Sequence, residues 1–306
     1  MTARRGFALA ELLVSILLIA IVGGAITSGL RRQQQVFRSI AVMVSTRGDA
    51  RDAAEVLAAD LSSASPIDTL TLAVDSAVEF FSLIGASISC DSAPGYVIRL
   101  PPEKLQSGNR LTTLLAAPDS GDVLLVFNDD SAATAGEPRW DRHVIAAVAS
   151  ASAASACPAA TGFTTAADQS APAYVLTLSG AASDGVPGGA PVRILRRTRY
   201  SLYRASDSRW YLGQRRCGSL GPPACGAIQP VSGPYMPYSG TGQSGIALRY
   251  LDPASVPLWS PGGTSRVALV EVTVRVRART PIQLRGPAPS QYLDSAAVSI
   301  ALRNRD

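Results

Sequence analysis

The sequence contains very little of what an enzyme needs. It has one histidine, His143, in 306 residues, and it has no Gly-x-Ser-x-Gly motif, no Gly-x-x-x-x-Gly-Lys phosphate loop and no His-Glu-x-x-His motif. Catalysis requires acids, bases or nucleophiles placed together. We expect His143, beside Asp141 and Arg142, to be an ordinary residue at the end of a strand. The sequence therefore predicts no enzyme and no cofactor.

Charge and cysteine are also scarce. Charged residues make up 17% of the chain, and the net charge of +5 is small for this length, so a direct nucleic-acid partner is not expected. The four cysteines have no Cys-x-x-Cys spacing, which argues against zinc, and they suit an oxidising compartment. Three pairings are open. We favour Cys217–Cys225, a small loop worth roughly 2.5 kcal/mol, and by elimination Cys90–Cys157.

Two acidic clusters are the remaining candidates for a metal. Residues 119–122 and 128–130 carry aspartate and asparagine oxygens that could bind Ca²⁺, and the same residues also make ordinary turns. We predict no metal site.

The most informative stretch is the N-terminal one. Residues 7–30 are mainly apolar and carry one charge, Glu11, and as a helix they would extend roughly 36 Å, enough to cross a bilayer core of about 30 Å. A carboxylate in such a helix costs roughly 2.5–3.5 kcal/mol near the bilayer centre and less near an interface. We therefore expect Glu11 to have a partner.

The residues before the apolar run indicate that partner. A secretory signal has its cleavage site after the apolar stretch, whereas here a glycine precedes it, behind Arg4 and Arg5. The chain reads Gly6-Phe7-Ala8-Leu9-Ala10-Glu11. This resembles the leader of type IV prepilins and type II secretion pseudopilins, Gly-Phe-Thr-Leu-Ile/Val-Glu. Ala8 and Ala10 depart from the pattern at its tolerant positions.

The resemblance implies that a prepilin peptidase removes residues 1–6 by cutting between Gly6 and Phe7 and then N-methylates Phe7. Loss of Arg4 and Arg5 would lower the net charge by two, from +5 to +3. The new amine at Phe7 would be cationic, with an ordinary pKa of about 7.7–8. Glu11 could pair with the Phe7 amine of a neighbouring subunit or, four residues away on one helix, with its own. The alternative is a plain membrane anchor with an incidental acidic residue.

The helical pattern continues beyond residue 30. Within residues 31–64, apolar positions recur at three- and four-residue steps, and they predict an amphipathic second half of one long helix. The recurring positions are Val36, Ile40, Met43, Arg47, Ala50, Ala54, Leu57 and Leu61. Gly23 and Gly24 mark either a bend or close helix packing. Arg31 and Arg32 follow the apolar run, so charge alone does not set the orientation. The resemblance of the leader implies that the N-terminus lies in the cytoplasm.

Residues 65–306 read as a β-rich globular domain, because the apolar period changes towards two. The clearest strand, 267–277, alternates valine with polar residues. The other candidates are 70–74, 78–83, 96–100, 123–127, 144–148, 174–178, 192–203, 209–212, 246–251 and 297–302. Residues 149–172, 180–191 and 217–245 are expected to be surface loops. Arg193, Arg197 and Arg199 share one face of a strand, which is either a binding surface or a solvated face. Tyr235, Met236 and Tyr238 either contact a neighbour or staple their own loop.

As a whole, the sequence resembles the J-type pseudopilins and the PilW-like minor pilins. The leader match is specific, and the rest is a resemblance of pattern. It implies an α+β, pilin-like subunit that helps to initiate or cap a type IV pilus or type II secretion pseudopilus. The alternative is a membrane-anchored binding module resembling a tip adhesin. Expected partners are the prepilin peptidase/N-methyltransferase, other minor and major (pseudo)pilins, the inner-membrane assembly platform and lipid. The expected location is the inner membrane, single-pass, with a periplasmic domain, and then the filament.

Overall fold

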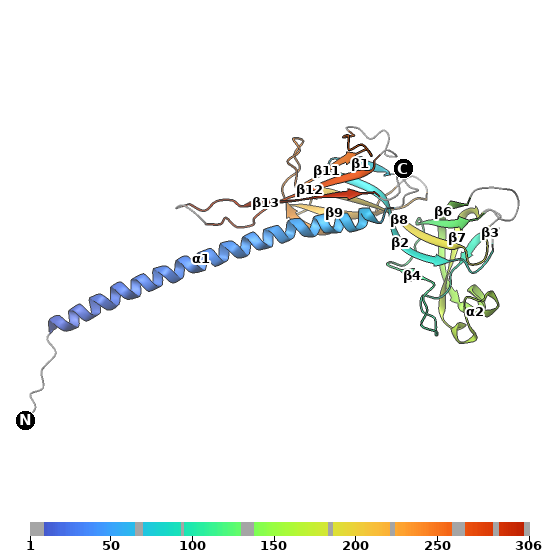
Figure 1. The fold of residues 1–306 in the computed structure, drawn as a ribbon, viewed down its shortest axis with the longest axis horizontal. Coiled ribbons are helices and arrows are strands. Elements are labelled where there is room, and N and C mark those ends of the chain that lie inside the picture. Colours follow the sequence, from blue (N-terminus) through green and yellow to red (C-terminus); the bar gives the residue numbers. More distant parts are fainter. Residues whose placement is uncertain are drawn as a thin grey trace, which may run out of the picture.

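A long helix carries a β-rich domain at its C-terminal end (Figure 1). The computed structural model describes residues 9–64, 70–92, 95–129, 138–182, 186–220, 224–258, 267–283 and 288–302. The expectation of an α+β fold, with a long N-terminal helix packed on a β-rich domain, is confirmed. The elements are α1 (Leu9–Ser62), β1 (Leu72–Val74), β2 (Ala77–Ile88), β3 (Gly95–Arg99), β4 (Thr113–Leu114), β5 (Val123–Asn128), β6 (Arg139–Ser152), α2 (Ala153–Ala156), β7 (Pro172–Ala182), β8 (Pro191–Arg204), β9 (Trp210–Cys217), β10 (Gln229–Tyr235), β11 (Ile246–Leu251), β12 (Leu269–Arg277) and β13 (Leu293–Ala301), with short 3₁₀ turns at Ala159–Thr161 and Ala166–Asp168.

Helix α1 has 54 residues and is therefore about 81 Å long. Only its C-terminal part, from Ser39 onward, is covered by the domain. The buried positions follow a helical spacing of three, four and seven residues, as one face of a helix on a sheet requires. They are Ser39, Thr46, Ala50, Ala53, Ala54, Leu57 and Leu61.

The sequence placed the start of this buried face wrongly. Val36 and Ile40 are exposed, and so is Arg47, while the polar Ser39 and Thr46 are buried instead. The reason is that the first contact is polar: Ser39 exchanges hydrogen bonds with the backbone of Gln283 in the β12–β13 connection. The apolar periodicity was real, but at its start it does not face the domain.

The described strands form two sheets. One runs in the order β1-β2-β8-β5-β6-β7-β3, with β9 and β10 added beside β8 and β4 beside β2, and the other is β11-β12-β13. Both sheets contribute to the core beneath α1, where the alternating valines of β12 are buried.

Strands β2 and β8 run through two hydrophobic cores. Phe80 of β2 and Tyr200 of β8 pack beneath α1, while Ile84 and Ile194, farther along the same strands, pack in a second core with β3, β5, β6 and β7. The domain therefore has two lobes, one on the helix and one beyond its end, and Figure 1 shows β6, β7 and β3 in the second.

A polar layer separates the two cores. Ser82 of β2 and Thr198 of β8 hydrogen-bond at 3.0 Å. Next to them, buried Arg196 donates to both carboxylate oxygens of buried Asp122, at 2.9 and 2.6 Å, and to the carbonyl of Ala117. The two lobes are thus joined by directional bonds as well as by continuous strands.

Most of the expected strands are present, β4 is an additional two-residue strand, and two longer strands differ from expectation. Strand β10 lies inside the segment expected to be a loop, and it contains Pro230 and Pro234. It forms because β9 offers a ladder and because the register breaks at the prolines. Strand β6 extends to Ser152, farther than its apolar residues indicated, because β7 pairs with it as far as Pro172.

Candidate functional site

The free part of α1 is the candidate site. Every described side chain from Glu11 to Arg38 is exposed, and the helix is unbroken (Figure 1). Its N-terminal part is long and apolar enough to cross a membrane, and none of that apolar window is buried against the protein. From Leu12 to Leu30 the helix rises by about 28 Å, close to the thickness of a bilayer core.

The polar side chains within the apolar part are satisfied by the helix itself. Ser15 donates to the carbonyl of Glu11 at 2.7 Å, Thr27 to that of Gly23 at 2.7 Å and Ser28 to that of Ala25 at 2.9 Å. Lipid offers no hydrogen-bond partners, so this arrangement lowers the cost of placing the segment in a membrane.

Glu11 stands at the end of this segment. Its side chain is exposed, and within the described residues its carboxylate has no hydrogen-bond or ion-pair partner. Gly6 and Phe7, the expected cleavage and methylation site, lie outside the described residues.

Helix α1 continues without a break through Gly23 and Gly24. A Cβ atom built on either residue would meet nothing within 4 Å. The chain itself therefore does not require glycine here, and of the two readings this arrangement favours close packing against another helix.

A second apolar surface begins where the membrane-length segment ends. The exposed fractions are 41% for Val36, 63% for Phe37, 46% for Ile40 and 67% for Val44. These four residues form one stripe of α1, adjoining the stripe that the domain buries farther along the helix, and we call them the outer stripe. At about 1.5 Å per residue they lie about 9–21 Å beyond Leu30.

The C-terminal part of α1 is fixed to the domain by polar contacts. The hydroxyl of Tyr200 donates to Asp60 and accepts from Gln214; burial and the bond to Asp60 raise the pKa of Tyr200. The hydroxyl of Tyr235 donates to Ser232 at 2.6 Å and lies 3.3 Å from the carbonyl of Asp49. Burial raises the pKa of Tyr235 to about 12.

Tyr235, the last residue of β10, therefore ties its strand to α1. Tyr238 ties its segment to the connection between β1 and β2, because its hydroxyl donates to Asp75 at 3.0 Å, and its side chain is partly exposed.

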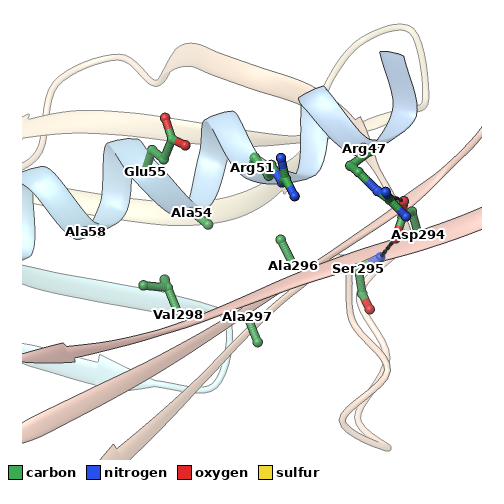
Figure 2. A pocket seen from close by; sticks show the side chains of 10 residues that line it. All are labelled: Arg47, Arg51, Ala54, Glu55, Ala58, Asp294, Ser295, Ala296, Ala297 and Val298. Atoms are coloured by element: carbon green, nitrogen blue, oxygen red, sulfur yellow. Dashed lines mark hydrogen bonds and ion pairs between the residues drawn. The ribbon is translucent and has the colours of Figure 1, made fainter. Parts of the chain in front are cut away.

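A groove of about 540 Å³ lies between α1 and β13. Figure 2 shows Arg47, Arg51 and Glu55 on the helix side and Asp294 to Val298 on the strand side. Arg47 closes one end by pairing with Asp294 at 3.1 Å. Burial raises the pKa of Asp294, but the Tyr292 hydroxyl, the Ser295 N–H and Arg47 outweigh burial, and the pKa is lowered overall.

On the face of β2 and β8 that points away from α1, a buried glutamate, Glu79, pairs with two of the arginines expected on one face of a strand. Glu79 has no exposed side-chain surface, and it accepts from Thr71 at 2.7 Å and from Arg199 at 2.6 Å, and pairs also with Arg197. Burial alone would raise the pKa of Glu79, but these donors lower it. Arg193 stacks over Trp140 at 4.5 Å. Two of the three arginines are thus structural.

Both disulfides are the pairs favoured from the sequence. Cys90 joins Cys157, and Cys217 joins Cys225. Cys217 and Cys225 lie beside Glu79, a grouping that could suggest a metal site. Sulfur atoms bound in a disulfide are not thiolate ligands, so this cluster is structural.

The acidic cluster at residues 119–122 makes a turn. Asp122 is occupied by Arg196 and also accepts the Asp119 N–H at 2.9 Å. Asp130 lies outside the described residues. His143 is half-buried in β6, and burial lowers its pKa.

Comparisons of the chain with protein-family models, with curated proteins and with solved structures find no match.

Proposed function

We propose that the protein is a minor pilin or pseudopilin, a structural subunit that helps to initiate or cap a filament of the type IV pilus or type II secretion kind. Before assembly it would be held in the inner membrane by the first part of α1, with its N-terminus in the cytoplasm and the β-rich domain in the periplasm.

The outer stripe is the observation that carries this proposal. A plain membrane anchor accounts for the apolar residues up to Leu30, where lipid covers them. It does not account for Val36, Phe37, Ile40 and Val44, which lie beyond the bilayer core and which the domain leaves uncovered. Exposed apolar patches of this kind mark interaction sites. A bundle of neighbouring helices in a filament would cover them.

Glu11 is the second support. In the filament its carboxylate would lie near the Phe7 amine of a neighbour, in surroundings poor in water. Removing one partner of a buried ion pair leaves an uncompensated charge, so the pair would select the correct register more than it would add stability. The six-residue leader is consistent with this, because its removal creates the amine.

The test is mass spectrometry of the intact chain and its N-terminal peptide, from cells with and without the prepilin peptidase. We expect a mature protein that begins at N-methylated Phe7 only when the peptidase is present, and Gly6→Ala should leave an uncleaved, membrane-retained precursor. A start at Met1 in both strains, or cleavage after the apolar run, would contradict the proposal.

Glu11→Val tests the second step. This variant should be cleaved normally but should be depleted from filaments, measured by immunoblotting of the filament fraction. Wild-type incorporation of Glu11→Val would refute the pairing argument while leaving the class of protein intact.

A further inference from the structure

The outer edge of β13 is open. Among the described strands, β13 pairs only with β12, in a register that runs without a break from Leu269↔Ala301 to Arg277↔Leu293. Leu302 N–H donates to the carbonyl of Ala268 and Ala278 N–H to that of Tyr292. In an antiparallel ladder these bonds fix which residues face the partner strand. The N–H and C=O groups of Val298 and Ile300 therefore point toward β12. Those of Ala297, Ser299 and Ala301 point outward, away from β12.

These outward groups have no partner in the described part of the chain. The Ser295 N–H is taken by the carboxylate of Asp294. Among the residues that the structure describes, none makes a backbone hydrogen bond to the outward groups of Ala297, Ser299 or Ala301, and all three residues are exposed. The edge thus presents a row of alternating donors and acceptors.

The other outer strands that the structure describes are protected. Strand β1 has three residues, and β10 contains two prolines and two register shifts. Strand β3 has a register shift, and the Arg99 carbonyl at its end accepts from Cys90. On the outer side of β11, Leu248 donates to Asp75 and Tyr250 accepts from Leu258.

By contrast, the part of β13 beyond Asp294 lacks the protections seen on those strands. Between Ser295 and Ala301 it carries no proline and no charge, only small or apolar side chains. Soluble proteins block long open edges because they pair readily with other chains. An unblocked edge of this length marks a place where a strand is received.

The groove between α1 and β13 has room for the side chains of such a strand. Its volume of about 540 Å³ lies within the range of roughly 300–1,000 Å³ for ligand pockets. Figure 2 shows Ala54 and Ala58 lining the helix side, with Arg51 and Glu55 beside them. A strand beside β13 would place small or apolar side chains against the alanines, and an acidic and a basic one opposite Arg51 and Glu55.

The occupant is not a symmetric second copy. Arg47 pairs with Asp294 at one end of the groove, and Ala58 and Val298 line the other, so β13 and α1 run in the same direction. Two copies joined antiparallel through β13 would hold their helices in opposite directions. Their apolar segments could not then enter one membrane from the same side.

We propose that the β13 edge accepts an extended strand from a different subunit of the same assembly, which extends the β11-β12-β13 sheet beside α1. This rests on the proposed function, because it requires a neighbouring subunit. Backbone hydrogen bonds between this strand and β13 would hold the neighbouring subunit in place. Arg51 and Glu55 of α1 would contact the side chains of the added strand.

The test is residue-resolved hydrogen exchange on the full-length chain, free in detergent micelles and in the purified filament fraction. We expect the amides of Ala297, Ser299 and Ala301 to exchange fast in the free chain and at least about tenfold more slowly in the filament. The amides of Val298 and Ile300 are internal controls, since they face β12 and should be protected in both. Fast outward amides in filaments that contain the subunit would overturn the strand proposal and leave the proposed function standing.

Two other outcomes would also overturn it. Protection of the outward amides already in the free chain, with a dimer mass by light scattering, would identify a second copy as the occupant. Absence of the processed chain from filaments would contradict both this proposal and the proposed function. Mass spectrometry of the N-terminal peptide shows whether the chain was processed and so identifies that case.

A proline variant adds an independent readout. Ala297→Pro removes an outward N–H and leaves every bond to β12 in place, and Ala297→Ser keeps the N–H. We expect Ala297→Pro to be processed but depleted from filaments and Ala297→Ser to behave as wild type. Equal incorporation of the two variants would contradict the proposal, and if Ala297→Pro fails to fold, the exchange measurement on the wild-type chain decides.

Discussion

Replacing Glu79 with glutamine should destabilise the domain strongly, because one buried carboxylate holds two arginines and a threonine. Its side chain is fully buried, while those of Arg197 and Arg199 are 17% and 34% exposed. Breaking a well-buried ion pair costs about 3–5 kcal/mol. Since both arginines keep some contact with water, we expect roughly 2–4 kcal/mol for Glu79→Gln.

The measurement is thermal unfolding of the full-length chain in detergent, followed by tryptophan fluorescence. A loss of this size should lower the Tm by roughly 4–16 °C for a domain of this length. The matched control is Glu271→Gln, whose partner Arg249 lies on the surface with a side chain 63% exposed. That change should cost less than about 1 kcal/mol.

The pH dependence follows from the lowered pKa of Glu79. A carboxylate whose pKa is lower in the folded state stabilises the protein fully above its unfolded pKa of about 4.3, and the stabilisation is lost as the pH falls through the folded value. The difference between wild type and Glu79→Gln should therefore be largest near neutral pH and shrink below about pH 4. A Tm shift no larger than that of Glu271→Gln, or a difference that does not change with pH, would refute the reasoning.

Two further changes separate assembly from folding. Phe37→Ser should leave the Tm and leader cleavage unchanged and lower the amount of subunit in filaments, because it removes apolar surface that only a neighbour would bury; Leu115→Ser, at an exposed site on the far lobe, should have no effect in the same immunoblot. Asp122→Asn should cost about 3–5 kcal/mol in urea unfolding, because it breaks the buried pair with Arg196 between the two cores. The exposed pair of Asp91 and Arg99 is its control, and equal losses for Asp122→Asn and Asp91→Asn would contradict the role of the polar layer.

Much of the fold could be predicted from apolar periodicity. Ala50, Leu57 and Leu61 were placed on the buried face of α1 by their spacing, and the alternating valines of β12 by theirs. Where the contact is polar, as at Ser39, periodicity misleads, because it records apolar residues and not what they face. Strand β10 was missed for a related reason: its prolines argue against a strand, and only the ladder offered by β9 shows that it forms.

The polar centres were harder to find. Glu79 lies inside the apolar run Val78–Phe81, and a charge in such a run demands a partner, so the arginines on alternate positions of β8 were an available signal. Their meeting depends on the β2–β8 register, which pairs Glu79 with Arg199 and which local sequence does not specify. The open edge of β13 is a property of topology, and no local pattern predicts which strand ends a sheet.

The outer stripe and Glu11 have different roles in the proposed assembly. Full burial of a large apolar side chain contributes about 1.5–3 kcal/mol, so covering the half-exposed stripe would contribute on the order of 3–6 kcal/mol. That is enough to set how much subunit joins a filament, but apolar contact is not directional and leaves the helix free to slide. A carboxylate that must meet an amine does not allow sliding, although it adds little stability. Phe37→Ser should therefore weaken incorporation without altering position, whereas Glu11→Val should weaken the choice of position itself.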